Sequence, residues 1–175
     1  MKTQNIEKYL NSFGKQVVNR AKGGIQKAKG GGTNLEKSIR FEVKTDADGF
    51  TVQFFMDSYG TFVDKGVSGT QQARKFKDYK GQVKSSPYKY TTKQPPPSIL
   101  AKWISKKGMK GRDKKTGRFI SNMSLAFIIG RAIKRDGIQG ISFFQKPLGL
   151  GLKQFGKDLL GAVKEDIIEG LTTVN

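Results

Sequence analysis

Residues 39–56 read IRFEVKTDADGFTVQFFM and carry the clearest structural signal in the chain. Apolar side chains alternate with polar ones on both sides of DADG, which is the period of a strand with one buried face. Asp48-Gly49 supplies the positive φ that a tight hairpin turn requires. The sequence therefore predicts two antiparallel strands that turn the following residues to one core face: Ile39, Phe41, Val43, Phe50, Val52, Phe54 and Met56.

An amphipathic segment precedes this hairpin. In residues 4–22 apolar side chains recur at helical spacing, with lysines and polar residues between them. The segment predicts a helix that docks on the apolar face of the hairpin. Its stripe consists of Ile6, Tyr9, Leu10, Phe13 and Val17. Gly23, Gly24 and the run at 30–32 then interrupt the pattern, which predicts a flexible glycine-rich loop at 23–32.

Two helices are expected in the middle of the chain. The prolines at 95–97 exclude a helix before them and preset φ for a helix after them. Asn122 can cap a second helix, which Gly137 closes. The side chains expected to face inward are Leu100, Trp103 and Ile104 in the first helix and Leu125, Ile128, Ile129, Ala132 and Ile133 in the second.

The C-terminal part predicts a short strand and a last helix. Ile141, Phe143 and Phe144 suggest the strand, and Pro147 opens a helix whose apolar side chains step by three or four. Glycines at 149, 151, 156 and 161 lie between or beside those side chains. Each weakens a helix by about 1 kcal/mol relative to alanine. They indicate either an irregular first turn or the close approach of another backbone, as in helix packing between subunits.

The composition bounds the chemistry. The chain of 175 residues has 33 Lys+Arg and 14 Asp+Glu, a net charge of +19, whose self-repulsion a polyanionic or acidic neighbour would offset. Cysteine and histidine are both absent, which removes thiol nucleophiles, disulfides, zinc sites built on sulfur or imidazole, and the commonest general base. We see no secretion signal and no long apolar window, so we expect a soluble intracellular product without membrane contact.

The positive charge is concentrated in the middle of the chain. Residues 60–120 have sixteen bases and three acids, a net charge of +13. Between 71 and 97 aromatic residues are interleaved with lysines, which can indicate nucleic-acid binding through phosphate contacts and base stacking, although no RNP, KH or zinc-finger pattern accompanies them. A solvated loop anchored by its aromatic residues is the other interpretation.

These observations predict an α+β fold in a single domain, residues 1–175. A twisted antiparallel sheet would carry the N-terminal, middle and C-terminal helices on it. Long basic loops would form an insertion at about residues 67–120.

Three stretches resemble chemical sites. SYGTFVDKGVS at 58–68 sets Asp64 beside Lys65 among aromatics and glycines, but a strand end in a core or interface, with an ion pair of small value, is the simpler interpretation. GLGLKQFG at 149–156 matches no phosphate-loop pattern. The acids at 46, 48, 57 and 64 lack the carboxylate arrangement of a metal-dependent nuclease. We therefore expect no catalysis, no cofactor and no metal.

The order of the segments carries a resemblance. A helix, TNLEKSIRFEV running into a hairpin, YGTFVDKG, PPPSILAKWISKKG, SLAFIIGRAIKRDGI and finally FFQKPL opening the last helix together resemble the neck and tail-completion proteins of tailed bacteriophages. In that family a tyrosine-aromatic-acid-glycine stretch follows the hairpin, and a Phe-Leu-Pro-like segment opens the closing helix. The basic region at 67–120 and the loop at 23–32 depart from the family, so contacts made by those parts are not carried over.

The resemblance implies an α+β virion subunit, made in the host cytoplasm, that forms a closed ring of roughly six or twelve copies where the head portal joins the tail. Expected partners are other neck, portal-adaptor or tail proteins and, without sequence specificity, genome DNA in the channel. Subunit contacts are expected at Tyr59, Phe62, Val63, Asp64, Gly66, Gly149, Gly151 and Gly156, the first four of these residues on a sheet strand. Contacts to a partner or to DNA are expected at Arg74, Lys75, Lys77, Lys80, Lys84, Lys110, Arg112, Lys114, Lys115 and Arg118.

Three classes of function remain open at this point. A structural ring component predicts discrete high-order oligomers. A nucleic-acid-binding module predicts a monomer or dimer whose DNA affinity depends on salt. An enzyme predicts turnover with a divalent metal.

Overall fold

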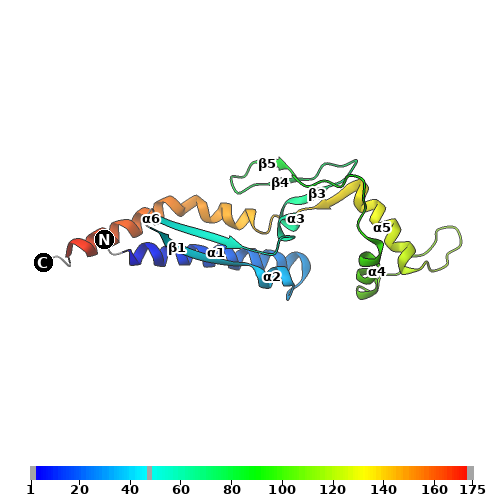
Figure 1. Ribbon diagram of the computed structural model, residues 1–175, viewed down its shortest axis with the longest axis horizontal. Coiled ribbons are helices and arrows are strands. Elements are labelled where there is room, and N and C mark those ends of the chain that lie inside the picture. Colours follow the sequence, from blue (N-terminus) through cyan, green and yellow to red (C-terminus); the bar gives the residue numbers. More distant parts are fainter. Residues whose placement is uncertain (1–2, 47–48, 173–175) are drawn as a thin grey trace. The chain divides into compact units, whose positions relative to one another are not determined.

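The structure, a computed structural model, describes residues 3–46 and 49–172. Within these residues the chain is α+β, as predicted, with six helices and six strands (Figure 1). The helices are α1 (Gln4–Lys29), α2 (Asn34–Ser38), α3 (Gly60–Lys65), α4 (Pro97–Lys106), α5 (Asn122–Asp136) and α6 (Gln145–Thr172). The strands are β1 (Arg40–Asp46), β2 (Gly49–Phe55), β3 (Gly66–Ser68), β4 (Lys75–Lys77), β5 (Val83–Ser85) and β6 (Gly137–Gln139).

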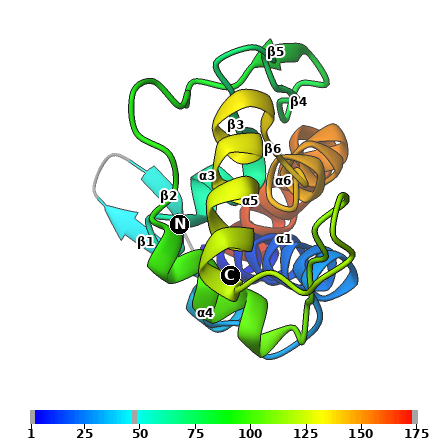
Figure 2. The ribbon, with the colours of Figure 1, turned by 90° about the vertical axis from the view of Figure 1, so that its right-hand side faces the viewer.

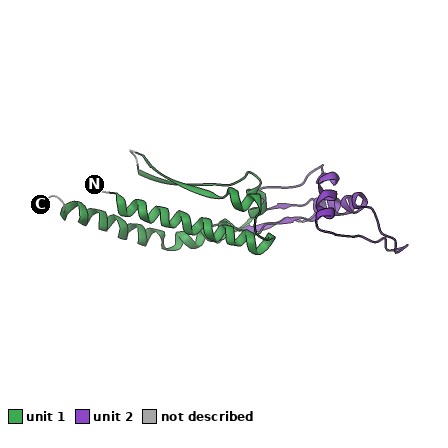
Figure 3. Ribbon diagram, turned by 90° about the horizontal axis from the view of Figure 1, so that it is seen from below, with its two compact units in different colours: residues 1–64, 77–84, 141–175 green, residues 65–76, 85–140 purple. Residues whose placement is uncertain are grey.

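The chain divides into two compact units, which Figure 3 colours separately. Unit 1 comprises residues 1–64, 77–84 and 141–175, and unit 2 comprises residues 65–76 and 85–140. Unit 1 contains α1, α2, the β1–β2 hairpin, α6 and most of α3. Unit 2 contains β3, β6, α4 and α5.

Helix α1 is longer than the sequence predicted. It runs from Gln4 to Lys29 and ends at Gly30, which has a φ of 82°. The helix continues through both glycines at 23–24, so the predicted loop is wrong for residues 23–29. Ile25 is fully buried within this part. Burying a large apolar side chain contributes about 1.5–3 kcal/mol, which offsets the cost of two helical glycines, about 1 kcal/mol each.

The β1–β2 hairpin forms as predicted. The two strands pair antiparallel along their whole length. Gly49 has a φ of 140°, whereas Asp48, the other predicted turn residue, lies outside the described residues. The hairpin lies beside α1 (Figure 2), with the Phe41 ring so close to Gly14 of α1 that a Cβ there would clash with it.

Helices α1 and α6 lie side by side and carry most of the core of unit 1 (Figure 1). One buried cluster consists of Val18, Ala21, Ile25, Leu35, Ile39 and Phe143, and another consists of Ile6, Leu10 and Ala162. Phe13 is also buried and makes edge contacts with the rings of Phe54 and Phe155, at centroid distances of 6.4 and 4.8 Å. The apolar stripe predicted for residues 4–22 therefore faces the core.

The segment after the hairpin is helical. Residues 60–65 form the short helix α3, so the prediction that Tyr59, Phe62, Val63 and Asp64 lie on a sheet strand is wrong. The backbone of this segment holds the start of the C-terminal region, because the carbonyls of Val63 and Asp64 accept the N–H groups of Ile141 and Ser142 at 3.0 and 2.9 Å. The aromatic-rich pattern has the composition of a strand, but the segment forms local bonds, since the carbonyl of Tyr59 accepts the N–H groups of Phe62 and Val63 at 3.1 and 3.2 Å.

In unit 2 the predicted middle helices are present. Helix α4 follows the prolines, and α5 ends at Gly137 with a φ of 75°, although the hydroxyl of Ser121 rather than Asn122 caps its start. The predicted inward faces are only partly buried: Ile104 has no exposed surface, whereas Trp103 is 43 % exposed and Ile128 is 49 % exposed. Ala126 and Gly130 are the buried residues of α5.

The strands do not form one sheet. They make three separate two-stranded sheets, β1–β2, β3–β6 and β4–β5, so the single twisted sheet of the prediction is not present within the described residues. The last strand is also misplaced, since β6 covers Gly137–Gln139 and not 141–144. Phe143, predicted on that strand, is instead buried in the core of unit 1.

Candidate functional site

Asp64, the acid of the 58–68 stretch, has a structural task. Its side chain is buried, and Oδ1 accepts hydrogen bonds from the N–H groups of Phe144 at 2.8 Å and Gln145 at 3.4 Å. These are amides at the start of α6, so the carboxylate supplies the acceptor that a helix N-terminus needs. Asp64 is therefore not the surface residue that the sequence suggested.

The other residues of that stretch divide between surface and interior. Tyr59 and Phe62 are each 43 % exposed, and Val63 packs against the core of unit 1. Gly66, in unit 2, has a φ of 78°, and a Cβ there would lie 2.6 Å from the carbonyl oxygen of Ile138. Of the predicted contact residues in this stretch, Tyr59 and Phe62 are the ones whose side chains are available to a neighbour.

Asp166 caps the start of α1 in the same way. It has no exposed surface, and its two carboxylate oxygens accept the N–H groups of Asn5 and Ile6, each at 3.0 Å. Burial raises the pKa of Asp166, but these hydrogen bonds outweigh burial and hold the pKa below its ordinary value. Nothing in the sequence around Asp166 signals this role, because its partners lie at the far end of the chain.

The glycines of α6 fall into two groups. A Cβ at Gly149 would clash with the backbone carbonyl of Tyr79, and one at Gly151 would lie 2.8 Å from the ring of Phe13. These two positions allow close packing within unit 1. Gly156, the third predicted contact glycine, has no atom within 4 Å of a Cβ built there, and the same is true of Gly161. The second half of α6 therefore has open space beside its glycines.

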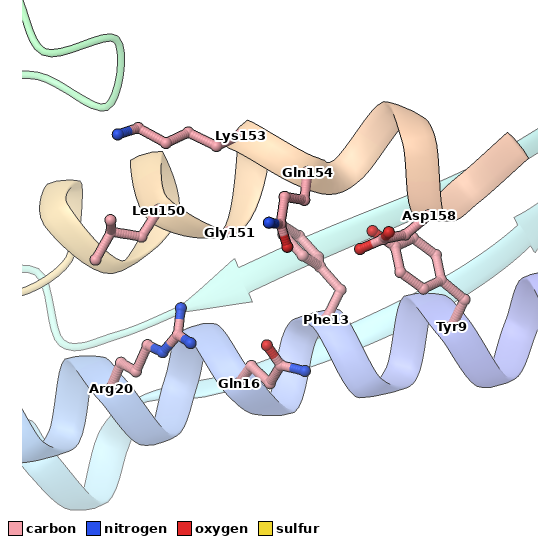
Figure 4. Close-up of a pocket in the computed structure, with 9 residues that line it drawn as sticks. All are labelled: Tyr9, Phe13, Gln16, Arg20, Leu150, Gly151, Lys153, Gln154 and Asp158. Carbon is pink, nitrogen blue, oxygen red and sulfur yellow. The ribbon is translucent and has the colours of Figure 1, made fainter. Parts of the chain in front are cut away.

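Around Leu150 the surface of unit 1 is hollowed. One hollow of about 350 Å³ lies between α1 and α6, and Figure 4 shows Arg20 and Lys153 on opposite helices at its rim. A second, of about 560 Å³, lies between the end of α1 and the start of α6. A third, of about 640 Å³, separates α6 from the 77–81 segment. Leu150, 55 % exposed, lines all three, and we call them together the Leu150 groove.

Basic side chains surround this groove. Lys77 and Lys80 were predicted from the sequence, and the fold adds residues far away along the chain: Arg20, Lys27, Lys146 and Lys153. Of the two acids that line it, Asp78 is paired with Lys84 at 2.8 Å, which lowers the pKa of the Asp78 carboxyl. Asp158 is the other. The groove thus combines an apolar floor with a positively charged rim, which suits an acidic partner.

Apart from Lys84, which belongs to unit 1, the remaining predicted basic residues lie in unit 2. Arg74 is directed inward, with Nε donating to the carbonyl of Asp136 at 2.8 Å, whereas Lys75 is exposed on β4. The basic residues of the 110–118 turn are all exposed: Lys110, Arg112, Lys114, Lys115 and Arg118. Here the Arg112 guanidinium lies 4.3 Å from the centre of the Phe119 ring, which is 61 % exposed. The sequence-predicted arm is therefore shared between two units.

Unit 1 also leaves apolar surface uncovered. A hollow of about 560 Å³ between β2 and the α1–α6 pair is lined entirely by apolar residues: Ile6, Leu10, Phe13, Phe50, Val52, Phe54, Leu148, Leu152, Phe155 and Leu159. On the outer side of α6, a second stripe of apolar side chains is exposed, including Leu160 at 71 % and Leu171 at 70 %. Apolar surface of this extent is typical of assembly surfaces.

Neither a metal cluster nor a membrane-spanning helix is found in the part of the chain that the structure describes. Groups of three or more acidic side chains placed to hold a cation are absent from residues 3–46 and 49–172. In the same residues, every helix is too short or too polar to cross a bilayer. Comparison with protein-family models, curated proteins and solved structures finds no match.

Proposed function

We propose that the protein is a structural component of a tailed-phage virion, forming a ring in the neck or tail-completion region that joins the portal side of the head to the tail. The family is suggested by the order of sequence segments described above. The proposal assigns the chain binding surfaces and no catalytic centre, and its twisted sheet would be completed between copies.

One observation carries the assembly role. The sheet over the helices of unit 1 stops at two strands, although the helix pair beneath it is wider than a hairpin, because helices pack 8–10 Å apart and strands only about 4.8 Å. The apolar hollow beside β2 is the part that the hairpin does not cover. A two-stranded sheet is marginal on its own, so contact with another chain would stabilise this layer.

The outer face of α6 supplies a second surface. Leu160, Ile167, Ile168 and Leu171 are all exposed, and Gly156 and Gly161 leave space beside them for a neighbouring backbone. The sequence placed the subunit contact at a supposed sheet edge near residues 58–66. Since α3 is not an edge, we move that contact to the exposed face of α6.

The basic surfaces are assigned to neighbours of the ring. The Leu150 groove and the 110–118 turn would bind an acidic portal, adaptor or tail protein, or phosphates of DNA in the channel. Binding an acidic neighbour would offset the self-repulsion of a chain with a net charge of +19. Reversing Lys110, Arg112, Lys114 and Lys115 to Glu should then abolish head-to-tail joining and leave the fold intact.

The test of the ring is a change on α6. In Leu160→Glu/Leu171→Glu the exposed stripe gains charge, and we expect discrete high-order oligomers of the wild type to be lost in native mass spectrometry. Thr172→Glu, which adds charge to the same exposed end of α6 without removing an apolar group, is the control and should assemble normally. A wild-type chain that stays monomeric at high concentration, and is absent from ring-shaped assemblies in particles, contradicts the proposal.

A nucleic-acid-binding module is the second candidate. It is favoured by Phe119, whose exposed ring lies beside both Lys110 and Arg112, at 5.7 and 4.3 Å from the ring centre. An aromatic ring flanked by cations can stack a base while the cations bind phosphates. This candidate predicts that Phe119→Ala weakens single-stranded DNA binding, with little effect on oligomer size.

A further inference from the structure

Strand β1 has an edge that the chain does not use. Apart from its ladder with β2, its residues 40–46 make no other backbone hydrogen bond among the described residues. An unpaired strand edge is a template for another strand. The side chains that border this edge show which strand fits it.

The exposed face of β1 alternates in charge. Arg40, Glu42, Lys44 and Asp46 are all exposed, whereas Phe41 and Val43 between them are half-buried on the helix side. In a chain where bases outnumber acids 33 to 14, this face has as many acids as bases. Charges that only prevent pairing at a strand edge need not alternate in sign, since lysines alone would prevent it.

The fold of the single chain explains only one of these charges, since the Arg40 guanidinium lies 4.6 Å from the ring centre of Phe55, its partner across the hairpin. Across the hairpin, Glu42 lies opposite Gln53 and Lys44 lies opposite Thr51, so both charges face neutral side chains. Glu42 has a loose ion pair with Arg40 at 3.7 Å. Among the described residues, Lys44 and Asp46 have no ion pair within 4.0 Å.

We propose that the outer edge of β1 pairs antiparallel with β1 of a second copy of this chain, in a register centred on Val43. In this register each Arg40 lies opposite an Asp46 and each Glu42 opposite a Lys44, so every exposed cross-strand pair joins opposite charges. On the helix side, Val43 meets Val43. The contact is two-fold and self-complementary, and it continues the hairpins of two copies into one four-stranded sheet.

The charge pattern also selects this register over its neighbours. Moving the centre by one residue, to position 42 or 44, sets Arg40 against Lys44 or Glu42 against Asp46 and pairs position 42 or 44 with itself, so like charges meet throughout. In the remaining registers a charged residue of one strand would lie opposite an apolar residue of the other. The apolar face of the second copy would then turn toward solvent. If β1 paired with β2 of a second copy, the charges of β1 would face the neutral side chains of Thr51 and Gln53. Such a contact would not favour one register over another.

The test is a charge swap within β1. Glu42→Lys turns two symmetry-related attractive pairs into repulsive ones, and so does Lys44→Glu, whereas the double variant restores opposite charges with their positions exchanged. We expect each single variant to raise the dissociation constant of the dimer by at least about tenfold. The double variant should recover most of the lost affinity. Sedimentation velocity at about 0.15 M salt, where distant charges are screened, measures this.

Two controls separate the contact from general charge effects. Lys37→Glu, at an exposed position of α2 outside β1, changes the net charge as Lys44→Glu does and should leave the dimer unchanged. Because the chain has no cysteine, Val43→Cys introduces the sole thiol at the two-fold axis and should form a disulfide-linked dimer on mild oxidation, whereas Thr51→Cys should not. Circular dichroism should show that all variants remain folded.

The inference does not depend on the ring proposed above, and the results distinguish the two. Loss of high-order rings in the α6 variant, with the charge swap behaving as expected, rejects neither. A wild type without any dimer, a dimer insensitive to the single reversals, or a double variant as weak as the singles overturns the β1 pairing. None of these three outcomes contradicts a ring held by α6.

Discussion

In unit 1 the long helix α1 buries a nearly complete side-chain stripe, with Val17, Ala21 and Ile25 at 1 % exposure or less. In unit 2 the buried apolar residues are few, and large ones such as Ile99, Phe119 and Phe127 are 64, 61 and 48 % exposed. The amount of apolar surface removed from water sets most of the folding free energy. Unit 1 therefore has the larger core and unit 2 the smaller one, although both leave large apolar side chains exposed to a partner.

The largest expected effect separates the two units directly. Ile25 and Ile104 are both fully buried, the first in unit 1 and the second in unit 2. Far-UV circular dichroism mainly follows α1 and α6, of 26 and 28 residues, while the one tryptophan, Trp103, reports on unit 2. We expect Ile25→Ala to lower the unfolding free energy seen by dichroism by about 2–5 kcal/mol and to leave the tryptophan transition nearly unchanged.

Ile104→Ala should do the reverse, shifting the fluorescence transition in urea alone. The exposed Ile99→Ala is the control and should stay within about 0.5 kcal/mol by either probe. Coincident transitions for the wild type and for both core variants would show that the chain unfolds as one cooperative block and would remove the distinction between the units.

Lowering the pH should have a smaller effect on stability, and this effect should be confined to unit 1. The folded pKa of Asp166 lies below its ordinary value of 3.8. The stability contributed by this carboxylate is therefore fully present above that value and is lost as the pH falls through the folded pKa. In Asp166→Asn, which cannot ionise and loses one of the two acceptor oxygens, the dichroism midpoint should be lower at neutral pH.

The same variant should also vary less with pH between about pH 4 and pH 2 than the wild type does. Fluorescence of Trp103 in unit 2 should show no difference between the two proteins over that range. If the variant and the wild type keep a constant separation at every pH, the carboxylate does not titrate in the way that its hydrogen bonds indicate.

The smallest expected effect compares two glycines of α6. Gly156→Ala places a methyl group in open space and should stabilise unit 1 by up to about 1 kcal/mol, because alanine favours the helix. Gly149→Ala would force a methyl group against the Tyr79 backbone and should destabilise unit 1. Thermal melts of both variants measure the difference. Loss of stability in Gly156→Ala would mean that a neighbouring chain already occupies that space.

The sequence predicted elements whose signals are local. The alternation in 39–56 gave the hairpin, the prolines at 95–97 gave α4, and Gly137 gave the end of α5. In each case a few adjacent residues restrict φ or set the period of burial, so no distant contact is needed. The register and turn of the hairpin follow from the same residues.

Where distant contacts decide, the sequence misled or was silent. Residues 60–65 have a strand-like composition, yet they form a short helix, and the carbonyls of Val63 and Asp64 bind the distant residues 141–142. The two glycines at 23–24 locally favour the end of a helix, but α1 continues through them because Ile25 is buried. The Leu150 groove gathers basic residues from α1, α6 and the 77–81 segment, so charge counting along the chain found only Lys77 and Lys80. Asp166 had no local signal at all.

The Asp166 cap sets an order of events during synthesis. A ribosome makes α1 early, but the acceptor for the amides of Asn5 and Ile6 is a side chain about 160 residues later in the chain. At 5–20 residues per second, this start of α1 waits roughly 10–30 s for its cap. During that interval its N–H groups and apolar stripe are open to chaperones. Fusions that disturb the C-terminal part of α6 should therefore first destabilise the start of α1, at the opposite end of the chain.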